Sequence, residues 1–412
     1  MVLKVAVPMD LVQGDVDEGY GRVADAFRAN FIKRHEIGAA CAAYRDGRKV
    51  VDLWGGYRDG YSKAPWDIDT IVPVASTTKG MAAMAVALAH TRGLIDFDAP
   101  VSSYWPEFAA NGKLAVTVRQ LLSHQAGLCA IDQPFELEDL ADLDRVAAVI
   151  ADQAPAWEPG TRHGYHGISL GWYEGELIRR VDPQHRSLGR FFADEIAEPL
   201  GIEFYIGLPE SVGDERLARF HAFKPPEMLL HLHEFPVKFV LGFLNPGSIT
   251  YKTFGNPRIL GFLDNYNRRD VLEVEIPAAN GVGSARAIAG AYGEFATGGK
   301  RLGLAASTLA ALSQAAAAPS GGREDVVLGI ESLFSLGYVK PFPRFLFGTS
   351  EGLAYGTPGG GGSFGFADPD LGLGFAYVMN RTGFRLYDDP REIALRDSLY
   401  RSMNATPQLP SA

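Results

Sequence analysis

The sequence predicts an α/β (α+β) fold, in which a mainly antiparallel sheet is flanked by helices and carries an inserted, mostly helical domain. Three observations predict this arrangement. Strand-like segments occur near both ends of the chain, helical stretches lie beside them, and the middle turns into short helices broken by proline and glycine. With 412 residues the chain is also too long for one compact core. We therefore expect an α/β domain from residues 1–95 and 276–412, and a helical domain from residues 96–275.

The N-terminal part predicts a helix, a hairpin and a second helix. Apolar residues recur at helical spacing over residues 17–34. Residues 38–59 follow as two strand-like segments joined at Asp46-Gly47, a dipeptide typical of a tight hairpin turn. Residues 76–91 are rich in Ala, Met and Leu, which favours a helix that stops at Gly93.

The remaining chain predicts further helices and a second group of strands. In the middle, helical stretches are clearest at residues 143–153 and 170–181. Residues 285–299 predict a helix that ends on two glycines. A glycine-rich run over residues 359–381 contains strand-like segments, and residues 389–403 predict a closing helix.

Composition excludes several classes of partner. The net charge is −10, from 39 Lys and Arg against 49 Asp and Glu, which disfavours nucleic acid and anionic membranes. No apolar run reaches the ~18 residues that a membrane-spanning helix needs. Two cysteines, Cys41 and Cys129, cannot form a disulfide framework and fit a reducing compartment. The first residues show no secretory signal pattern, so we expect a cytoplasmic protein.

The G-x-S-x-G pattern of many hydrolases occurs three times, around Ser169, Ser350 and Ser363. A nucleophile of that type needs a preceding strand and a histidine further along the chain. The last histidine is His233, so Ser350 and Ser363 lack the required partner. Ser169 follows a stretch that does not resemble a strand. With 47 glycines in the chain, the pattern arises easily by chance.

A second serine pattern, Ser76-Thr77-Thr78-Lys79, is the only S-x-x-K in the sequence. On a helix, residues three apart lie on one face, so the hydroxyl of Ser76 and the amine of Lys79 can approach each other. A buried lysine loses its charge more readily and can accept a proton from the serine. The alternative is that Ser76 only caps the helix and Lys79 extends to solvent.

Two further segments supply complementary groups. Tyr165 follows a Pro-Gly turn, which can present it at a cleft, and a tyrosine beside a lysine can act as a general acid and base. It is alternatively an ordinary core tyrosine. The run "YGTPGGGGSFGF" lets the backbone approach a substrate closely, and its N–H groups with that of Ser76 would form an oxyanion hole. Its alternatives are a flexible turn or a phosphate loop, although no G-K-[ST] follows.

Taken together, these segments resemble the serine β-lactamase-like, penicillin-binding-protein-type hydrolases, and most closely the family VIII carboxylesterases. The resemblance also covers the stretches "GLIDFDAPVSSYWPEF", "TVRQLLSHQAGL", "IPAANGVGSARAIAGAYGEFATGG" and "PGGGGSFGFADPDLGLGFAYVMNR". It implies a β-lactamase/transpeptidase-like fold, Ser76 as nucleophile, Lys79 as its helper and Tyr165 as general base. The oxyanion donors would be the backbone N–H groups of Ser76 and Gly360. No metal and no cofactor are implied.

Two departures from the family pattern bear on the substrate. Gly167 stands where relatives commonly have asparagine, and Thr357-Pro358-Gly359 stands where they have Lys-Thr-Gly. Without those side chains a charged β-lactam or peptide terminus has fewer partners, so we expect a serine carboxylesterase for short-chain, uncharged esters. Gly167, Thr357, Gly359 and His163 are the expected substrate-binding residues. The alternatives are a β-lactamase or D-amino-acid peptidase, an acyltransferase, and a catalytically silent ligand-binding protein.

Two remaining features have several interpretations. His231, His233 and Glu234 lie close together, but a proline follows and no third ligand motif is evident, so we expect no metal site. The apolar, aromatic stretch over residues 221–262 could cover an acyl pocket, form an interface in a homo-oligomer, or belong to the core.

Overall fold

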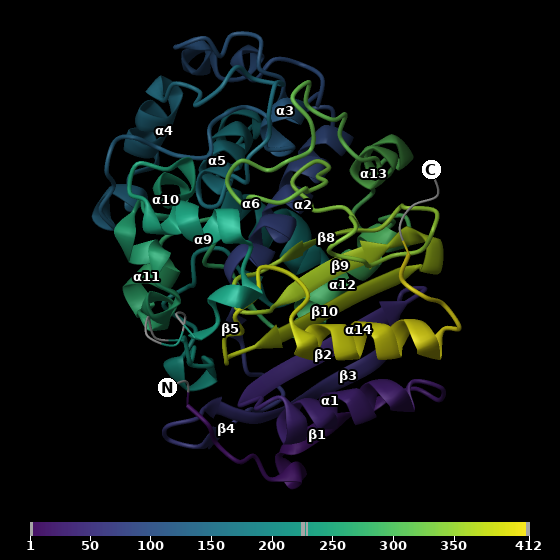
Figure 1. Cartoon of the computed structure of the whole chain (residues 1–412). Helices are drawn as coiled ribbons and strands as arrows, with labels where there is room; N and C mark the ends of the chain where they lie inside the picture. Colours follow the sequence, from purple (N-terminus) through teal and green to yellow (C-terminus); the bar gives the residue numbers. More distant parts are fainter. Residues whose placement is uncertain (1–2, 224–226, 228–229, 409–412) are drawn as a thin grey trace.

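Two antiparallel sheets organise the chain in a computed structural model that describes residues 3–223, 227 and 230–408. In the larger sheet the strand order is β1-β3-β2-β10-β9-β8, and β4 pairs with the outer part of β3 (Figure 1). Its strands are β1 (Val12–Val16), β2 (Gly38–Arg45), β3 (Arg48–Asp59), β4 (Ala64–Pro65), β8 (Tyr355–Pro358), β9 (Phe364–Asp368) and β10 (Leu373–Met379). Strands from the two ends of the chain therefore form one sheet.

The pairing of β2 with β10 joins the two ends at the centre of this sheet, with Cys41 opposite Tyr377. On its other side, β2 pairs with β3 through a tight turn in which Asp46 and Gly47 have φ angles of 51° and 77°. Positive φ at both central residues is what a two-residue hairpin turn needs, and Asp-Gly tolerates it. The predicted hairpin and the predicted antiparallel sheet are both confirmed.

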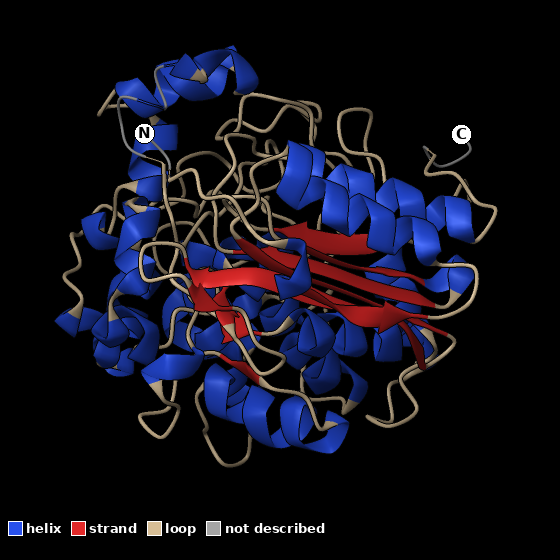
Figure 2. Cartoon of the chain, turned by 90° about the horizontal axis from the view of Figure 1, so that it is seen from below, coloured by secondary structure: helices blue, strands red, loops and turns tan. Residues whose placement is uncertain are grey.

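Helices cover both faces of the larger sheet (Figure 2). On one face lie α1 (Gly21–Lys33) and α14 (Pro390–Ser402), which pack against each other. On the other face α12 (Ala285–Ala296) packs against β2, β9 and β10. A Cβ atom at Gly374 would lie 2.1 Å from the backbone nitrogen of Gly293, so this close helix–sheet contact requires glycine. All three helices lie where the sequence predicts them, with ends shifted by a few residues.

Helix α2 (Thr78–Thr91) is the central helix of the molecule. Every residue from Thr78 to Ala89 is buried. In a water-soluble fold, a helix that is apolar on all sides has to be buried. Helix α2 meets this requirement because it lies between the sheet face that α12 covers and the helices from the middle of the chain (Figure 1). Lys79 is thus buried at the start of a core helix, which excludes the alternative that it extends to solvent.

The middle of the chain is mostly helical, as expected. Its helices are α3 (Val118–Leu122), α4 (Leu143–Asp152), α5 (Ser169–Val181), α6 (Leu188–Phe192), α7 (Glu198–Leu200), α9 (Val237–Leu244), α10 (Ile249–Phe254) and α11 (Arg269–Glu273), and α13 (Ala306–Ser313) follows later. A small sheet of β5 (Val72–Pro73), β7 (Val282–Gly283) and β6 (Phe204–Tyr205) was not predicted. Its two-residue strands are too short to leave a pattern in the sequence. The domain boundaries expected at residues 95/96 and 275/276 stay a prediction.

In the part of the chain that the structure describes, no helix is both long enough and apolar enough to span a lipid bilayer. The two cysteines, Cys41 and Cys129, are free and buried.

Candidate active site

Ser76 lies at a sharp bend between strand β5 and helix α2. The bend is a 3₁₀ turn, Ala75–Thr77, and α2 begins at Thr78, two residues later than the sequence predicts. Ala75 has a φ angle of 47°, a left-handed conformation that is uncommon for residues other than glycine. The Thr78 hydroxyl fixes the bend, because it donates to the Ala75 carbonyl (2.6 Å) and accepts the Gly281 N–H (2.8 Å). The half-buried Ser76 side chain is thereby presented at the surface of a cavity.

The Lys79 amine is buried beside Ser76. Its Nζ lies 3.1 Å from Ser76 Oγ, 2.6 Å from the Gly167 carbonyl oxygen and 2.9 Å from the Ala278 carbonyl oxygen. Burial lowers the pKa of Lys79 from 10.5 to about 7, although the carboxyl group of Glu174 acts in the opposite direction. A substantial fraction of Lys79 is therefore neutral near pH 7.

The three contacts determine what a neutral Lys79 can do. A neutral amine has two N–H groups and one lone pair in a tetrahedral arrangement. The carbonyl oxygens of Gly167 and Ala278 accept hydrogen bonds and cannot donate them, so they take the two N–H groups. The lone pair is then directed toward Ser76 Oγ, where it can accept the hydroxyl proton.

We expect kcat/KM for a neutral substrate to rise tenfold per pH unit below about 7 and to level off above it, because only neutral Lys79 accepts a proton. The pH at which kcat/KM stops rising follows from the lowered pKa of Lys79. A lysine with its ordinary pKa of 10.5 would instead let kcat/KM rise up to about that pH. Burial also raises the pKa of Asp325 to about 7, so the profile of Asp325→Asn is the control. If kcat/KM of Asp325→Asn no longer rose with pH below about 7, the titrating group would be Asp325 instead of Lys79.

Tyr165 completes a group of three side chains. The centre of its ring lies 4.7 Å from Lys79 Nζ. Burial raises the pKa of Tyr165, and contact with the Ser76 hydroxyl opposes that rise, so the phenol is protonated at neutral pH. The structure therefore brings together Ser76, Lys79 and Tyr165, the three residues that the sequence singled out.

Asp325 positions the Tyr165 backbone, a function that no motif predicted. Its two carboxylate oxygens lie 3.2 and 3.0 Å from the Tyr165 nitrogen, and one of them also accepts the N–H groups of Val327 and Leu328. Asp325 is fully buried and lies 160 residues further along the chain. Only the folded structure reveals this contact, because nothing near Asp325 in the sequence marks it.

The histidines beside Tyr165 are structural in this arrangement. His163 Nε2 lies 2.9 Å from the Arg323 carbonyl oxygen, and His166 accepts the Leu128 N–H at Nε2 while its Nδ1 lies 2.8 Å from the Gly164 carbonyl oxygen. Burial lowers the pKa of His166 to about 3, so it stays neutral. His163 was expected to bind substrate, but the structure places it outside the residues that line the cavity. Its contacts instead hold the segment that carries Tyr165.

The glycine-rich turn after β8 lies against the residues that precede Ser76. A Cβ atom at Gly359 would lie 2.3 Å from the Val74 carbonyl oxygen, and one at Gly360 would lie 3.8 Å from Ala75 Cβ. Close approach at Gly359 thus requires glycine. Within residues 3–223, 227 and 230–408, the backbone N–H groups of Ser76 and Gly360 have no hydrogen-bond acceptor. Both residues line the cavity, so both N–H groups are available to a bound oxygen atom.

A buried ionic network fixes this glycine turn from behind. The Gly361 carbonyl oxygen accepts hydrogen bonds from Arg391 Nη2 (3.1 Å) and from the Gly383 N–H (2.8 Å). Arg391 also forms ion pairs with Asp389 and Glu36, at 2.9 Å each. Buried charges are tolerated only when they are paired in this way. Helix α14, which begins beside this network, is thereby tied to the candidate oxyanion site.

Thr357 does not lie where the sequence placed it. It was expected to contact the substrate, but its side chain is buried on the opposite side of β8, against Gly80 of α2 and the hydroxyl group of Tyr292. Successive residues of a strand point to opposite faces, and Pro358, the next residue of β8, is the one that lines the cavity.

The three G-x-S-x-G serines have other positions. Ser169, at the start of α5, is buried and donates to the Leu128 carbonyl oxygen (2.7 Å). Ser363 is buried and donates to the Val74 carbonyl oxygen (2.9 Å), with its Oγ 3.0 Å from Thr77 Oγ1. Ser350 lies in a turn. None of the three lines the cavity that contains Ser76.

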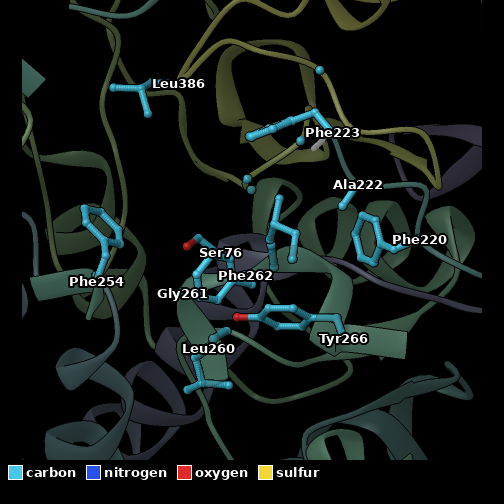
Figure 3. Close-up of a pocket in the computed structure, with 18 of the residues that line it drawn as sticks. Ser76, Phe220, Ala222, Phe223, Phe254, Leu260, Gly261, Phe262, Tyr266 and Leu386 are labelled. Atoms are coloured by element: carbon cyan, nitrogen blue, oxygen red, sulfur yellow. The ribbon is translucent and has the colours of Figure 1, made fainter. Parts of the chain in front are cut away.

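That cavity has a volume of about 1110 Å³ and is mostly apolar (Figure 3). Ser76, Tyr165, Gly167, Gly359 and Gly360 lie on its wall, and much of the remaining wall comes from residues 220–266. Among the interpretations of the apolar stretch 221–262, its described residues therefore favour a pocket wall. Residues 224–226 and 228–229 of that stretch lie outside the described residues.

Permanent charges lie only at the rim of the cavity. Of the described residues that line it, Arg219, Asp264 and Arg385 carry such a charge, and all three are exposed to solvent. His221 is buried, and burial lowers its pKa to about 4, so it is neutral at physiological pH. A charged group on a substrate would therefore have no ionic partner near Ser76 other than Lys79.

Gly167 contributes in two ways that the sequence did not reveal. Its carbonyl oxygen accepts a hydrogen bond from Lys79, so it belongs to the machinery that holds the amine. A Cβ atom at this position would lie 2.8 Å from Phe254 Cε1 and 3.0 Å from Thr253 Cγ2. Helix α10 thus occupies the space that an asparagine side chain would need.

Tyr266 is a further polar residue that sequence reasoning missed. It lies in a 3₁₀ turn, Leu263–Asn267, and its ring is buried while its hydroxyl points into the cavity toward Ser76 (Figure 3). Burial raises its pKa, so it is a neutral donor. Tyr266 lies between two asparagines just after the apolar stretch, and no motif around it in the sequence marks such a position.

Among the described residues, no group of three or more His, Cys, Asp or Glu side chains is arranged to hold a metal ion. His231 Nδ1 lies 2.9 Å from Glu234 Oε1, and Glu234 also pairs with Arg385.

Comparison with known proteins places this chain in a family. The family model described as Beta-lactamase matches residues 21–398. The esterase/beta-lactamase LipL of Mycobacterium tuberculosis is 34% identical over 384 residues, which cover 90% of this chain and 83% of that protein. The crystal structure of a family VIII carboxylesterase has 38% identity and a TM-score of 0.82, with 95% of this chain and 99% of that chain covered. A penicillin-binding protein homologue from Caulobacter crescentus has 34% identity and a TM-score of 0.80, with the same coverage. The resemblance and the fold class inferred from the sequence are thus confirmed, and the chain belongs to the beta-lactamase family.

Proposed function

We propose that this protein is a serine carboxylesterase that hydrolyses uncharged esters through an acyl-Ser76 intermediate. Ser76 Oγ attacks the ester carbonyl carbon while Lys79, assisted by Tyr165, takes the hydroxyl proton. The N–H groups of Ser76 and Gly360 stabilise the negative charge on the carbonyl oxygen. Tyr165 then protonates the alkoxide as the bond between the carbonyl carbon and the alcohol oxygen breaks.

The second half of the reaction repeats these steps with water. Tyr165 accepts a proton from water as the water oxygen attacks the acyl carbon, and the tetrahedral intermediate releases Ser76 and the carboxylic acid. Protons are passed between Ser76, Lys79 and Tyr165 throughout. No step draws on a metal or another cofactor.

One observation carries this proposal. The Lys79 amine is buried, lies 3.1 Å from Ser76 Oγ, and has its other two hydrogen-bonding positions occupied by backbone carbonyl oxygens. If Lys79 only stabilised the fold, its third hydrogen-bonding position would not need to face a serine on the cavity wall.

The preference for uncharged esters rests on the cavity. Its charged residues lie at the solvent rim, and neither Gly167 nor Pro358-Gly359 supplies a polar side chain that could hold a substrate carboxylate. Relatives that are esterases by name and match most of the chain support ester hydrolysis as the reaction.

The direct test compares p-nitrophenyl butyrate with nitrocefin, a β-lactam that carries a carboxylate, and with a D-alanyl peptide. We expect kcat/KM for the ester to exceed that for either amide substrate by about 10³-fold or more, since neither carboxylate finds an ionic partner other than Lys79. Comparable values for nitrocefin would instead assign the site to a β-lactamase. Formation of a new ester in the presence of added alcohol, faster than hydrolysis, would assign it to an acyltransferase.

Gly167→Asn is expected to lower the free energy of unfolding by about 1–3 kcal/mol, because the added side chain overlaps Phe254 and Thr253. It is also expected to lower esterase activity by displacing the carbonyl group that holds Lys79. Chemical denaturation and p-nitrophenyl butyrate hydrolysis measure the two effects. Adding Phe254→Ala should recover part of the lost stability, whereas a single variant as stable as wild type would show that α10 does not fill this space.

A cytoplasmic location and a possible homo-oligomer, both expected from the sequence, remain part of the proposal. Fractionation of the producing cells and sedimentation of the purified protein address them.

A further inference from the structure

We infer that the ester carries a large apolar group on one side of the scissile bond, instead of being a short-chain ester on both sides. This inference rests on the proposed esterase function and names the substrate class within it. It replaces the short-chain preference that the sequence suggested, because the sequence gives no measure of the cavity.

The first support is the size of the cavity. Pockets that bind drug-sized ligands usually measure about 300–1,000 Å³. The cavity at Ser76 measures about 1110 Å³, slightly above that range. A butyrate or acetate ester would fill only a small part of it and would leave apolar wall in contact with water.

The second support is the construction of the wall. Helix α9 directs Phe239, Val240 and Phe243 toward the cavity. The Phe239 ring lies 6.1 Å from the Phe243 ring and 5.9 Å from the Phe254 ring of α10, measured between centroids. Aromatic side chains packed against one another form a rigid, pre-formed surface, which suits an extended apolar ligand.

The third support is the distribution of polar groups. The hydroxyls of Ser76, Tyr165 and Tyr266 and the N–H group of Gly360 all belong to residues that line the same cavity, and the Tyr266 hydroxyl points toward Ser76 (Figure 3). Neutral donors and acceptors therefore gather where the ester bond must lie. The distant part of the wall is aromatic and aliphatic, so it suits a group without polar atoms.

The test first compares wild-type kcat/KM for p-nitrophenyl octanoate with that for p-nitrophenyl acetate, and for octyl acetate with that for ethyl acetate, all below the micelle-forming concentration. The first pair lengthens the acyl side and the second lengthens the alcohol side. Each methylene group that the cavity buries raises kcat/KM severalfold. We therefore expect kcat/KM for the longer ester to be about tenfold or more higher in at least one pair. Equal or higher values for the short ester in both pairs would overturn the inference.

Two matched variants on α9 then test whether the cavity holds the apolar group. Val240 lines the cavity, whereas Val237 lies on the same helix with 73% of the residue exposed. Val240→Trp should lower kcat/KM for the preferred long ester about tenfold or more relative to that for the short ester. Val237→Trp should change neither. Val240→Phe enlarges the side chain less and is therefore less disruptive to folding. It should give a loss of kcat/KM for the long ester between those of wild type and Val240→Trp.

An equal loss for long and short esters in folded Val240 variants would overturn the inference, since it would show a general disturbance of the site. The proposed function fails separately. If no ester of any length is hydrolysed and Ser76 is not acylated, the esterase assignment itself is wrong. If acetate esters are hydrolysed through Ser76 without a preference for the long ester, only the inference on substrate class fails.

Discussion

Lys79→Met is expected to lower kcat/KM for p-nitrophenyl butyrate by about 10⁴-fold or more, because it removes the base and keeps a side chain of similar length. The Ser76 hydroxyl would then lose the group that lies 3.1 Å away and accepts its proton. The loss should appear in kcat, because the amine contacts the nucleophile and backbone carbonyls instead of the substrate. Steady-state kinetics on the purified variant measures it.

Lys113→Met is the matched control for this variant. Lys113 is also a buried lysine, its Nζ also donates to two backbone carbonyl oxygens, of Ala110 and Gln153, and burial lowers its pKa to about 8. It does not line the cavity. Both variants leave two carbonyl groups without a partner, so both should lower the unfolding temperature. Only Lys79→Met should abolish turnover, and similar kinetic losses in the two variants would show that stability, not proton transfer, explains the effect.

Tyr165→Phe is expected to lower kcat by about 10²- to 10⁴-fold, the usual contribution of a general acid and base. The phenol is protonated at neutral pH because burial raises its pKa, so it can donate to the leaving alkoxide. A substrate with a good leaving group needs little protonation. The loss should therefore be smaller for p-nitrophenyl butyrate than for ethyl butyrate, and comparing the two esters separates the acid from the base function.

The control for Tyr165→Phe is Tyr355→Phe. Tyr355 is fully buried, whereas Tyr165 is half-buried, and within the described part of the chain the Tyr355 hydroxyl has no hydrogen-bond partner. Its removal should leave kcat unchanged and stability the same or slightly higher. If Tyr165→Phe retained more than half of the wild-type kcat for both esters, Tyr165 would be a structural residue and Lys79 would have to act without it.

Features set by neighbouring residues could be predicted from the sequence. The Asp46-Gly47 hairpin follows from turn chemistry, and α1, α12 and α14 follow from helical spacing. The contact between Ser76 and Lys79 follows from their three-residue separation, although a left-handed Ala75 makes the first turn 3₁₀. Tyr165 is indicated by its position after a Pro-Gly turn, and the family resemblance implies its function as general base.

Features that depend on distant residues could not be predicted. Asp325 reaches Tyr165 across 160 residues, and the Gly167 and Ala278 carbonyl groups reach Lys79 across 88 and 199 residues. Every residue has a backbone carbonyl group, so the sequence does not show which of them bind the Lys79 amine. Only the folded structure shows that two carbonyl oxygens take two of its hydrogen-bonding positions. The wrong placement of Thr357 has a similar cause. The face of β8 on which it lies depends on the register of the sheet, which a four-residue strand does not reveal.

The central claim is that Ser76 is the nucleophile and that Lys79 activates it. The most direct measurement is to incubate the protein with an activated p-nitrophenyl phosphonate and to locate the adduct by peptide mass spectrometry. We predict a stoichiometric label on Ser76, no label in Ser76→Ala, and labelling slowed by orders of magnitude in Lys79→Met but not in Lys113→Met. A label on Ser169, Ser350 or Ser363, or undiminished labelling of Ser76 in folded Lys79→Met, would contradict this claim.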